Sequence, residues 1–162
     1  MTPVLAERQL RTTPWKGLRS GSGDATEVGV DLEMLLFAEG DADDGAYERL
    51  ENEVESQGYL FECAPAVVSV IVAAVAEGAI PAENLASCLD VLGRIVAGYP
   101  DASEVAVGRS DLRELCHHEA MRGYWSLMRV ASERDRFNAW RAADAVLAVL
   151  DEKHSRTILQ RG

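Results

Sequence analysis

The sequence APAVVSVIVAAVAEG occupies residues 64–78 and carries the strongest structural signal in the chain. Residues 64–77 are apolar on nearly every side, which is typical of a helix buried at the centre of a domain. Pro65 suits the first helical turn, where its missing N–H costs nothing, and Gly78 is a typical residue just past a helix C-terminus. A buried strand over 67–75 is the competing interpretation. The length, the alanines, the proline start and the glycine stop favour the helix.

Helical spacing of apolar residues continues on both sides of this segment, and strand signals are nearly absent. The pattern predicts six helices, with Thr26 or Asp31 capping the first and Asp43 or Asp44 capping the second. We place these helices over about residues 26–40, 43–58, 64–77, 81–98, 110–132 and 137–150. Residues 101–108 are expected to form a loop. Because the connections are short, antiparallel neighbours are the simplest topology.

The length of 162 residues fits one domain, and 48% hydrophobic residues are enough to form a core. Residues 1–25 contain prolines and glycines without a sustained period, so we predict an irregular N-terminal arm. Residues 26–153 are then a single helical domain. Residues 154–162 are expected to be a frayed tail.

Residues 40–68, GDADDGAYERLENEVESQGYLFECAPAVV, resemble the HEAT-repeat-like proteins of actinobacteria, in which such a stretch joins one helical pair to the next. The WKGL motif at 15–18 and the GDAT motif at 23–26 resemble the N-terminal segment of that family, and the RDRF motif at 134–137 resembles the opening of its last helical pair. The resemblance covers about residues 15–152. It implies an all-α fold, a short right-handed α-α solenoid of about three antiparallel helix pairs. It implies no particular activity, because helical repeats serve many roles.

Charge is unevenly distributed along the chain. The formal net charge is −11, and residues 24–62 hold thirteen acidic side chains against one basic side chain. A field of this sign repels phosphate backbones, so it disfavours nucleic acid and favours a basic protein as the partner. A solvated face that only keeps the protein soluble is the competing interpretation. In the solenoid, the second helix of each pair would line an inner surface, which predicts a binding role for Glu48, Glu51, Glu55 and Arg141.

A second candidate site is the sequence ELCHHE at 114–119. Glu114, His117 and His118 have the i, i+3 and i+4 spacing of one helical face. A di-iron site would need a second Glu-x-x-His and two further glutamates on facing helices, and a zinc site would need another ligand at suitable spacing. Neither set is recognisable, so we predict no metal and no cofactor. We expect His117 and His118 at a partly exposed edge, where they would contact a partner.

The cysteines Cys63, Cys88 and Cys116 suggest neither a disulfide framework nor a metal knuckle, and buried free thiols fit a reducing compartment. Cys116 and His117 would point about 100° apart on a helix, which disfavours a thiol nucleophile with an adjacent base. No apolar run approaches the ~20 residues that cross a bilayer, and the N-terminus lacks the apolar core of a secretory signal. We therefore predict a cytoplasmic protein without membrane contact.

Binding rather than catalysis is the function that the sequence favours, since no catalytic residue can be assigned. Our first hypothesis is a protein-binding module with an acidic face, such as an immunity or inhibitor-like protein for a basic toxin. The alternative is an enzyme or small-ligand-binding protein with a pocket near His117 and His118. Two further alternatives are a nucleic-acid-binding helical repeat, which would use the arginines of the C-terminal half, and a homodimer formed through an apolar end of the solenoid.

Overall fold

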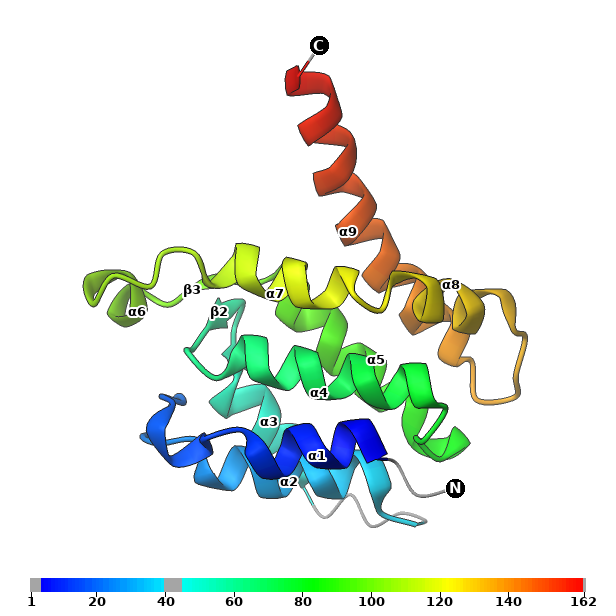
Figure 1. Ribbon diagram of the computed structural model, residues 1–162, viewed down its shortest axis with the longest axis horizontal. Coiled ribbons are helices and arrows are strands. Elements are labelled where there is room, and N and C mark those ends of the chain that lie inside the picture. The colour runs from blue at the N-terminus through cyan, green and yellow to red at the C-terminus, as the bar shows by residue number, and fades with distance from the viewer. Residues whose placement is uncertain (1–3, 40–44, 162) are drawn as a thin grey trace.

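The computed structural model describes residues 4–39 and 45–161, with side chains described as far as Glu152. Over these residues the protein is all-α, as the sequence predicts (Figure 1). In chain order, the elements are α1 (Val4–Thr12), the short 3-10 helix η1 (Trp15–Gly17), α2 (Thr26–Phe37), α3 (Ala46–Glu53), β1 (Glu55–Ser56), β2 (Tyr59–Leu60), α4 (Ala64–Glu77), α5 (Ala82–Ala97), β3 (Tyr99–Pro100), α6 (Ala102–Ala106), α7 (Leu112–Met121), α8 (Tyr124–Ser132) and α9 (Ala139–Arg161). The helix signals predicted at Gly40, Asp43 and Asp44 lie outside the described residues.

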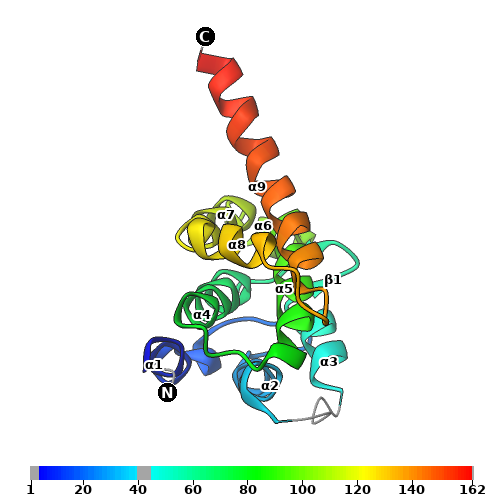
Figure 2. The same ribbon diagram turned by 90° about the vertical axis from the view of Figure 1, so that its right-hand side faces the viewer.

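Most of the helices lie in two layers that pack against each other (Figure 2). One layer holds α1, α4 and the consecutive helices α7 and α8, and the other holds α2, α5 and α9. The short helix α3 packs against α2 and α5. Because α4 contacts α1, α2, α5, α7 and α8, it is the central element of the fold.

The structure confirms the helix predicted over residues 64–77, and the strand alternative is wrong. Pro65 lies in the first turn of α4, as its missing N–H allows. Gly78 ends the helix in the left-handed region, with φ of 63°, and its N–H bonds to carbonyl groups of the last turn. Proline and glycine therefore mark the start and the end of α4 at the positions that the sequence predicts.

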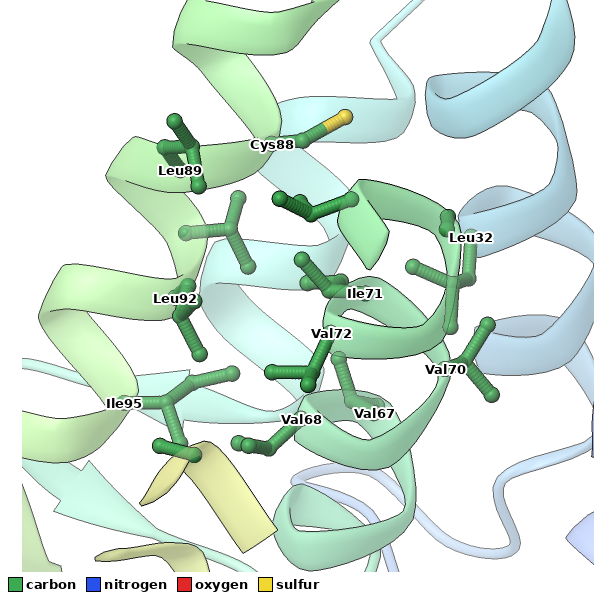
Figure 3. Close-up of a cluster of buried hydrophobic side chains, with 14 of the residues drawn as sticks. Leu32, Val67, Val68, Val70, Ile71, Val72, Cys88, Leu89, Leu92 and Ile95 are labelled. Atoms are coloured by element: carbon green, nitrogen blue, oxygen red, sulfur yellow. The ribbon is translucent and has the colours of Figure 1, made fainter. Parts of the chain in front are cut away.

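Burial on several sides of α4 explains why its sequence shows no polar face. Figure 3 shows Val70 on the side that faces Leu32 of α2, and Ile71 on the side toward Leu89 of α5. All four side chains are fully buried. A helix with packed neighbours around most of its circumference needs apolar residues at almost every position.

The prediction of an irregular arm over residues 1–25 is wrong for the described part, because α1 and η1 fold onto the body. α1 packs on α4 and buries Ala6 and Leu10, which lie one helical turn apart. The Glu77 carboxylate at the end of α4 accepts hydrogen bonds from the backbone N–H groups of Leu5 and Ala6. A carboxylate at this place satisfies free N–H groups and is stabilised by the helix dipole. The folded domain therefore includes α1.

A buried ion cluster ties distant parts of the chain together. The segment 101–108, predicted as a loop, contains α6, and Glu104 of that helix is fully buried. The Glu104 carboxylate lies 3.4 Å from Arg19 Nε and 3.3 Å from Arg109 Nη1. Glu62 lies 3.2 Å from Arg109 Nη2 and accepts a hydrogen bond of 3.1 Å from the backbone N–H of Arg19. These contacts hold the loop after η1 against the start of α4 and against α6.

The helix predicted to end at Gly58 ends earlier, and a small sheet follows that the sequence did not predict. β1 pairs with β2 in an antiparallel arrangement, and β2 pairs with β3 in a parallel one. Gln57 and Gly58 both have positive φ, as a tight hairpin between β1 and β2 requires. Strands of two residues are too short to show a polar-apolar alternation, so only the turn left a signal in the sequence.

The single helix predicted over residues 110–132 is divided into α7 and α8 at Gly123, which lies directly over α4. A Cβ atom at this position would lie 2.3 Å from Val72 Cγ1, a distance that packed atoms do not adopt. Only glycine therefore allows the helices to approach this closely. The sequence could not show why residue 123 has to be glycine, because Val72, which leaves no room for a side chain there, lies about fifty residues away in the chain.

We expect Gly123→Ala to lower the free energy of unfolding by about 1–3 kcal/mol, the usual cost of overpacking a core. Equilibrium unfolding in urea measures this loss. Adding Val72→Ala removes the clashing methyl group, so the double variant should lose less than the sum of the single losses. Gly23→Ala is the control, because nothing lies within 4 Å of its Cβ position. Strictly additive losses for Gly123 and Val72 would contradict the proposed contact.

The tail predicted to fray from residue 154 continues as helix, because α9 extends to Arg161. The second half of α9 rises away from the two layers (Figure 1). Its first half packs on α5 and α8 through residues such as Val146 and Leu150. Within residues 4–39 and 45–161, we find no helix with both the length and the apolar character that a bilayer span requires.

Candidate functional site

The α2–α3 end of the molecule carries exposed carboxylates. Glu27 and Glu33 lie on the exposed side of α2, Glu39 follows that helix, and Glu48 lies on α3. None of these four carboxylates makes a salt bridge with any residue of the described chain. Val30 lies between Glu27 and Glu33 on the same side and is half-exposed. We call Glu27, Glu33, Glu39 and Glu48 the acidic surface.

Two of the carboxylates predicted to bind a partner are instead neutralised within the protein. Arg94 of α5 forms a salt bridge with Glu51 and lies 4.0 Å from Glu55 and 3.4 Å from Asp90. Glu55 is buried and accepts a hydrogen bond from the backbone N–H of Gly58. The binding role predicted for Glu55 does not fit this burial, because a buried carboxylate cannot contact a partner. Of the three glutamates predicted to bind a partner, Glu48 alone is exposed and without an ion pair in the described structure.

The two adjacent histidines occupy different environments. His117 is buried, and its Nε2 lies 2.6 Å from the carbonyl oxygen of Val96 on α5. His118, one residue further along α7, is exposed. The expectation that both histidines lie at a partly exposed edge is therefore wrong for His117, because helix periodicity turns it toward α5. Neither histidine lines the hollows described below.

The thiols have the environment of core side chains. Cys63 and Cys116 are both fully buried, and burial raises the pKa of both, that of Cys116 to about 12. A thiol with such a pKa is protonated at neutral pH, which makes it a poor nucleophile and a poor metal ligand. Across the part of the chain that the structure describes, no three histidine, cysteine, aspartate or glutamate side chains are grouped so that they would hold a metal ion.

Arg141 does not join the other predicted binding residues. It is exposed on α9, and its guanidinium lies 5.2 Å from the centre of the Trp140 ring. Arg134 lies closer to the same ring, at 3.9 Å. These cation–π contacts fix Trp140 near the start of α9. The predicted site residues thus lie on α3, β1, α7 and α9, and the fold does not gather them into one site.

A shallow groove crosses α4 between α1 and α7. It has one hollow of about 120 Å³ near Leu5 and another of about 370 Å³ near Pro14. Gln9, Ser69 and Glu119 line both hollows. Small side chains on the outer side of α4 leave this space open, and the Gln9 amide bonds to Ser69 Oγ at 3.0 Å. The sequence could not show this groove, because one of its walls is the helix α1 that was predicted to be irregular.

The three tryptophans differ in their exposure. Trp15 is partly buried on Gly29, and its indole N–H donates to the carbonyl oxygen of Leu10 at 2.8 Å. Trp140 is partly covered by the arginines described above. Trp125 on α8 is 80% exposed. A tryptophan so far out of the core is typical of an interaction surface rather than of packing.

Comparison with known protein families, with curated proteins and with solved structures found no match to this chain.

Proposed function

We propose that this chain is a non-catalytic, protein-binding helical-repeat module that holds a basic protein against its acidic surface. The observation that carries the proposal is the set of four exposed carboxylates that lack an ion pair in the described structure. The other carboxylates that the structure describes between residues 24 and 62 have partners, such as Asp31 with Arg49 and Glu62 with Arg109. Unpaired like charges repel one another, and a basic partner would relieve that repulsion.

The proposal extends to the architecture. We infer a short right-handed HEAT-like solenoid built from the pairs α1–α2, α4–α5 and α7–α8 with α9. The two-layer arrangement supports it, since one member of each pair lies in each layer (Figure 2). The first pair differs from the one predicted, which joined the helices over residues 26–40 and 43–58. In the proposed solenoid, α1 is the partner of α2, and α3 is not part of the pair. Such stacks offer extended surfaces for partners and do not prescribe a chemistry.

An immunity or inhibitor-like role fits the acidic surface best, because opposite charges accelerate the encounter with a basic toxin. A cytoplasmic setting belongs to the same proposal, since the buried free thiols suit a reducing compartment. A catalytic or small-ligand site around His117 and His118 has less support, because His117 is bonded to a backbone carbonyl inside the protein.

The test is an affinity pull-down of the tagged protein from its own host at low and at moderate salt, read by mass spectrometry. One basic protein should be recovered with the wild type and lost as the salt concentration rises. The double variant Glu27→Lys with Glu33→Lys should recover at least ~10-fold less of it, because it reverses charges that attract the partner.

The matched control is Glu133→Lys with Asp144→Lys, which changes the net charge equally at two exposed sites, one just after α8 and one on α9. This control should recover the partner as the wild type does. Surface changes of this kind shift stability by only about 0.5 kcal/mol, so both variants should remain folded. Equal recovery from both double variants would contradict a specific role for the acidic surface.

A further inference from the structure

The surface of α7 and α8 opposite their buried residues has an apolar stripe. We call it the Trp125 face, and it consists of Leu115, His118, Met121, Trp125 and Met128. The members on α7 (Leu115, His118 and Met121) are three residues apart, and so are the two on α8 (Trp125 and Met128), which is the spacing of one helical face within each helix. Trp125 is 80% exposed, and Leu115, Met121 and Met128 are each at least 40% exposed.

The boundary between α7 and α8 does not interrupt this stripe. Arg122 is still in the helical region, with φ and ψ of −62° and −24°, whereas Gly123 departs from it, with −105° and 15°. Met121 just before this turn and Trp125 just after it are both exposed. The exposed apolar side chains therefore continue from α7 onto α8, over a length of about 20 Å at a rise of 1.5 Å per residue. Exposed large apolar side chains that line up in this way mark an interaction surface.

We propose that the Trp125 face binds a second copy of this chain, so that the protein forms a two-fold symmetric dimer. The order of charges along the face carries the inference. Glu114 at one end is exposed and has no salt bridge in the described structure, and Arg129 at the other end is exposed. In an antiparallel pair with its axis between Met121 and Arg122, each Glu114 lies opposite Arg129 of the second copy.

The same arrangement matches the apolar residues. Leu115 lies opposite Met128 of the second copy, and His118 lies opposite Trp125. Arg122 lies next to the axis, where two copies would bring like charges together, but it is paired with Glu119 at 3.2 Å. Arg129 donates one hydrogen bond of 3.2 Å to the carbonyl oxygen of Val75, and the guanidinium has further N–H donors. The face is therefore self-complementary, as a two-fold interface must be.

The distribution of charge over the molecule favours a dimer contact through α7 and α8. The net charge of −11 would oppose association through the acidic surface, which lies on α2 and α3. Helices α7 and α8 lie at the end of the stack opposite α1 and α2 (Figure 1). Residues 109–141 hold seven arginines against five carboxylates. In the proposed dimer the two acidic surfaces point away from each other, and screening over about 8 Å weakens their repulsion further.

The available area points to a reversible dimer. The exposed part of Trp125 contributes roughly 200 Å², and a stable interface buries about 800 Å² on each partner. The remainder has to come from the other side chains along α7 and α8. We therefore expect a dimer that dissociates on dilution, with Trp125 as the residue that contributes most to binding.

Sedimentation velocity over a range of protein concentrations tests the proposal. The wild type should pass from monomer to dimer as concentration rises, and Trp125→Ala should raise the dissociation constant by at least ~30-fold. Tyr59→Ala is the matched control, because Tyr59 is an exposed aromatic residue on β2 and does not belong to the Trp125 face. It should dimerise as the wild type does.

Charge exchange tests the antiparallel register. Glu114→Arg and Arg129→Glu should each weaken the dimer, since each places like charges opposite one another. The double variant exchanges the two charges and should recover most of the affinity. Thermal melting of each variant shows whether the fold survives loss of the Arg129 bond to Val75.

Three results would overturn the proposal. They are a wild type that stays monomeric at every concentration, a dimer that persists in Trp125→Ala, and a folded double charge exchange that recovers nothing. The outcome is independent of the proposed function, because Trp125→Ala should still recover the basic partner. Likewise, the acidic-surface variant Glu27→Lys with Glu33→Lys should still dimerise.

Discussion

Ile71→Ala is expected to lower the free energy of unfolding by about 2–5 kcal/mol, the range for removing a large aliphatic side chain from a core. Ile71 is fully buried near the middle of α4, on the side toward α5 (Figure 3). The change removes apolar contacts and leaves a cavity that neighbours on several helices cannot all move to fill. For a chain of this length, each kcal/mol corresponds to about 2–4 °C in the melting temperature.

Equilibrium unfolding in urea measures this effect, with two companion variants. Ile71→Val deletes one methylene group and should cost about 0.5–1.5 kcal/mol, so it remains measurable if the alanine variant does not fold. Val30→Ala is the control on the exposed side of α2 and should stay within about 0.5 kcal/mol of the wild type. A loss for Ile71→Ala no larger than that of Val30→Ala would mean that α4 is not the centre of the core.

Replacing both Arg19 and Arg109 by methionine is expected to cost about 3–5 kcal/mol, because Glu104 would be left as a buried charge without a partner. The Glu104 side chain is fully buried, whereas both arginines are partly exposed. The carboxylate therefore depends on the arginines to offset the loss of its hydration, while the arginines retain water without it. The loss of stability therefore comes from the buried carboxylate that remains, not from the arginines that are removed.

A third substitution separates this charge effect from simple loss of packing. Adding Glu104→Met to the double variant should recover much of the lost stability, since apolar residues of similar volume replace buried ion pairs at little cost. Arg11→Met is the control, because it breaks only the exposed pair with Glu7 and should leave the stability close to that of the wild type. If the triple variant is no more stable than the double, then the lost stability does not come from the buried charge.

The two proposed surfaces have a joint consequence. A dimer formed through the Trp125 face would present two acidic surfaces at opposite ends. A basic partner with two binding sites, or two partners on one scaffold, would then gain affinity from simultaneous contact. Trp125→Ala should reduce that gain and leave the binding of a single partner molecule unchanged.

The helices that the sequence located correctly are those whose signals are local. α4 is bounded by its own proline and glycine, and α2 and α5 show apolar residues at helical spacing along their length. α1 was missed because it buries only Ala6 and Leu10 among the described residues of that helix. Two apolar positions do not establish a period, and α1 is stable because it packs on α4.

The sequence showed that the candidate site is acidic, but it could not show which of its carboxylates are free of ion pairs. Composition located the excess of acidic side chains between residues 24 and 62. It could not show that Arg94 neutralises Glu51, since these two residues lie 43 positions apart in the chain. It also could not show that Glu55 turns inward to bond the Gly58 backbone.

The sequence by itself determined the helical class, the central position of α4 and the segment that carries the acidic charge. These follow from propensity, periodicity and composition, which are properties of neighbouring residues. Only the tertiary structure decided that the N-terminal segment folds onto α4, that Glu104 is held by Arg19 and Arg109, and that Trp125 lies on an open face. Each of these depends on contacts between distant segments, and local spacing holds no information about which distant segments meet.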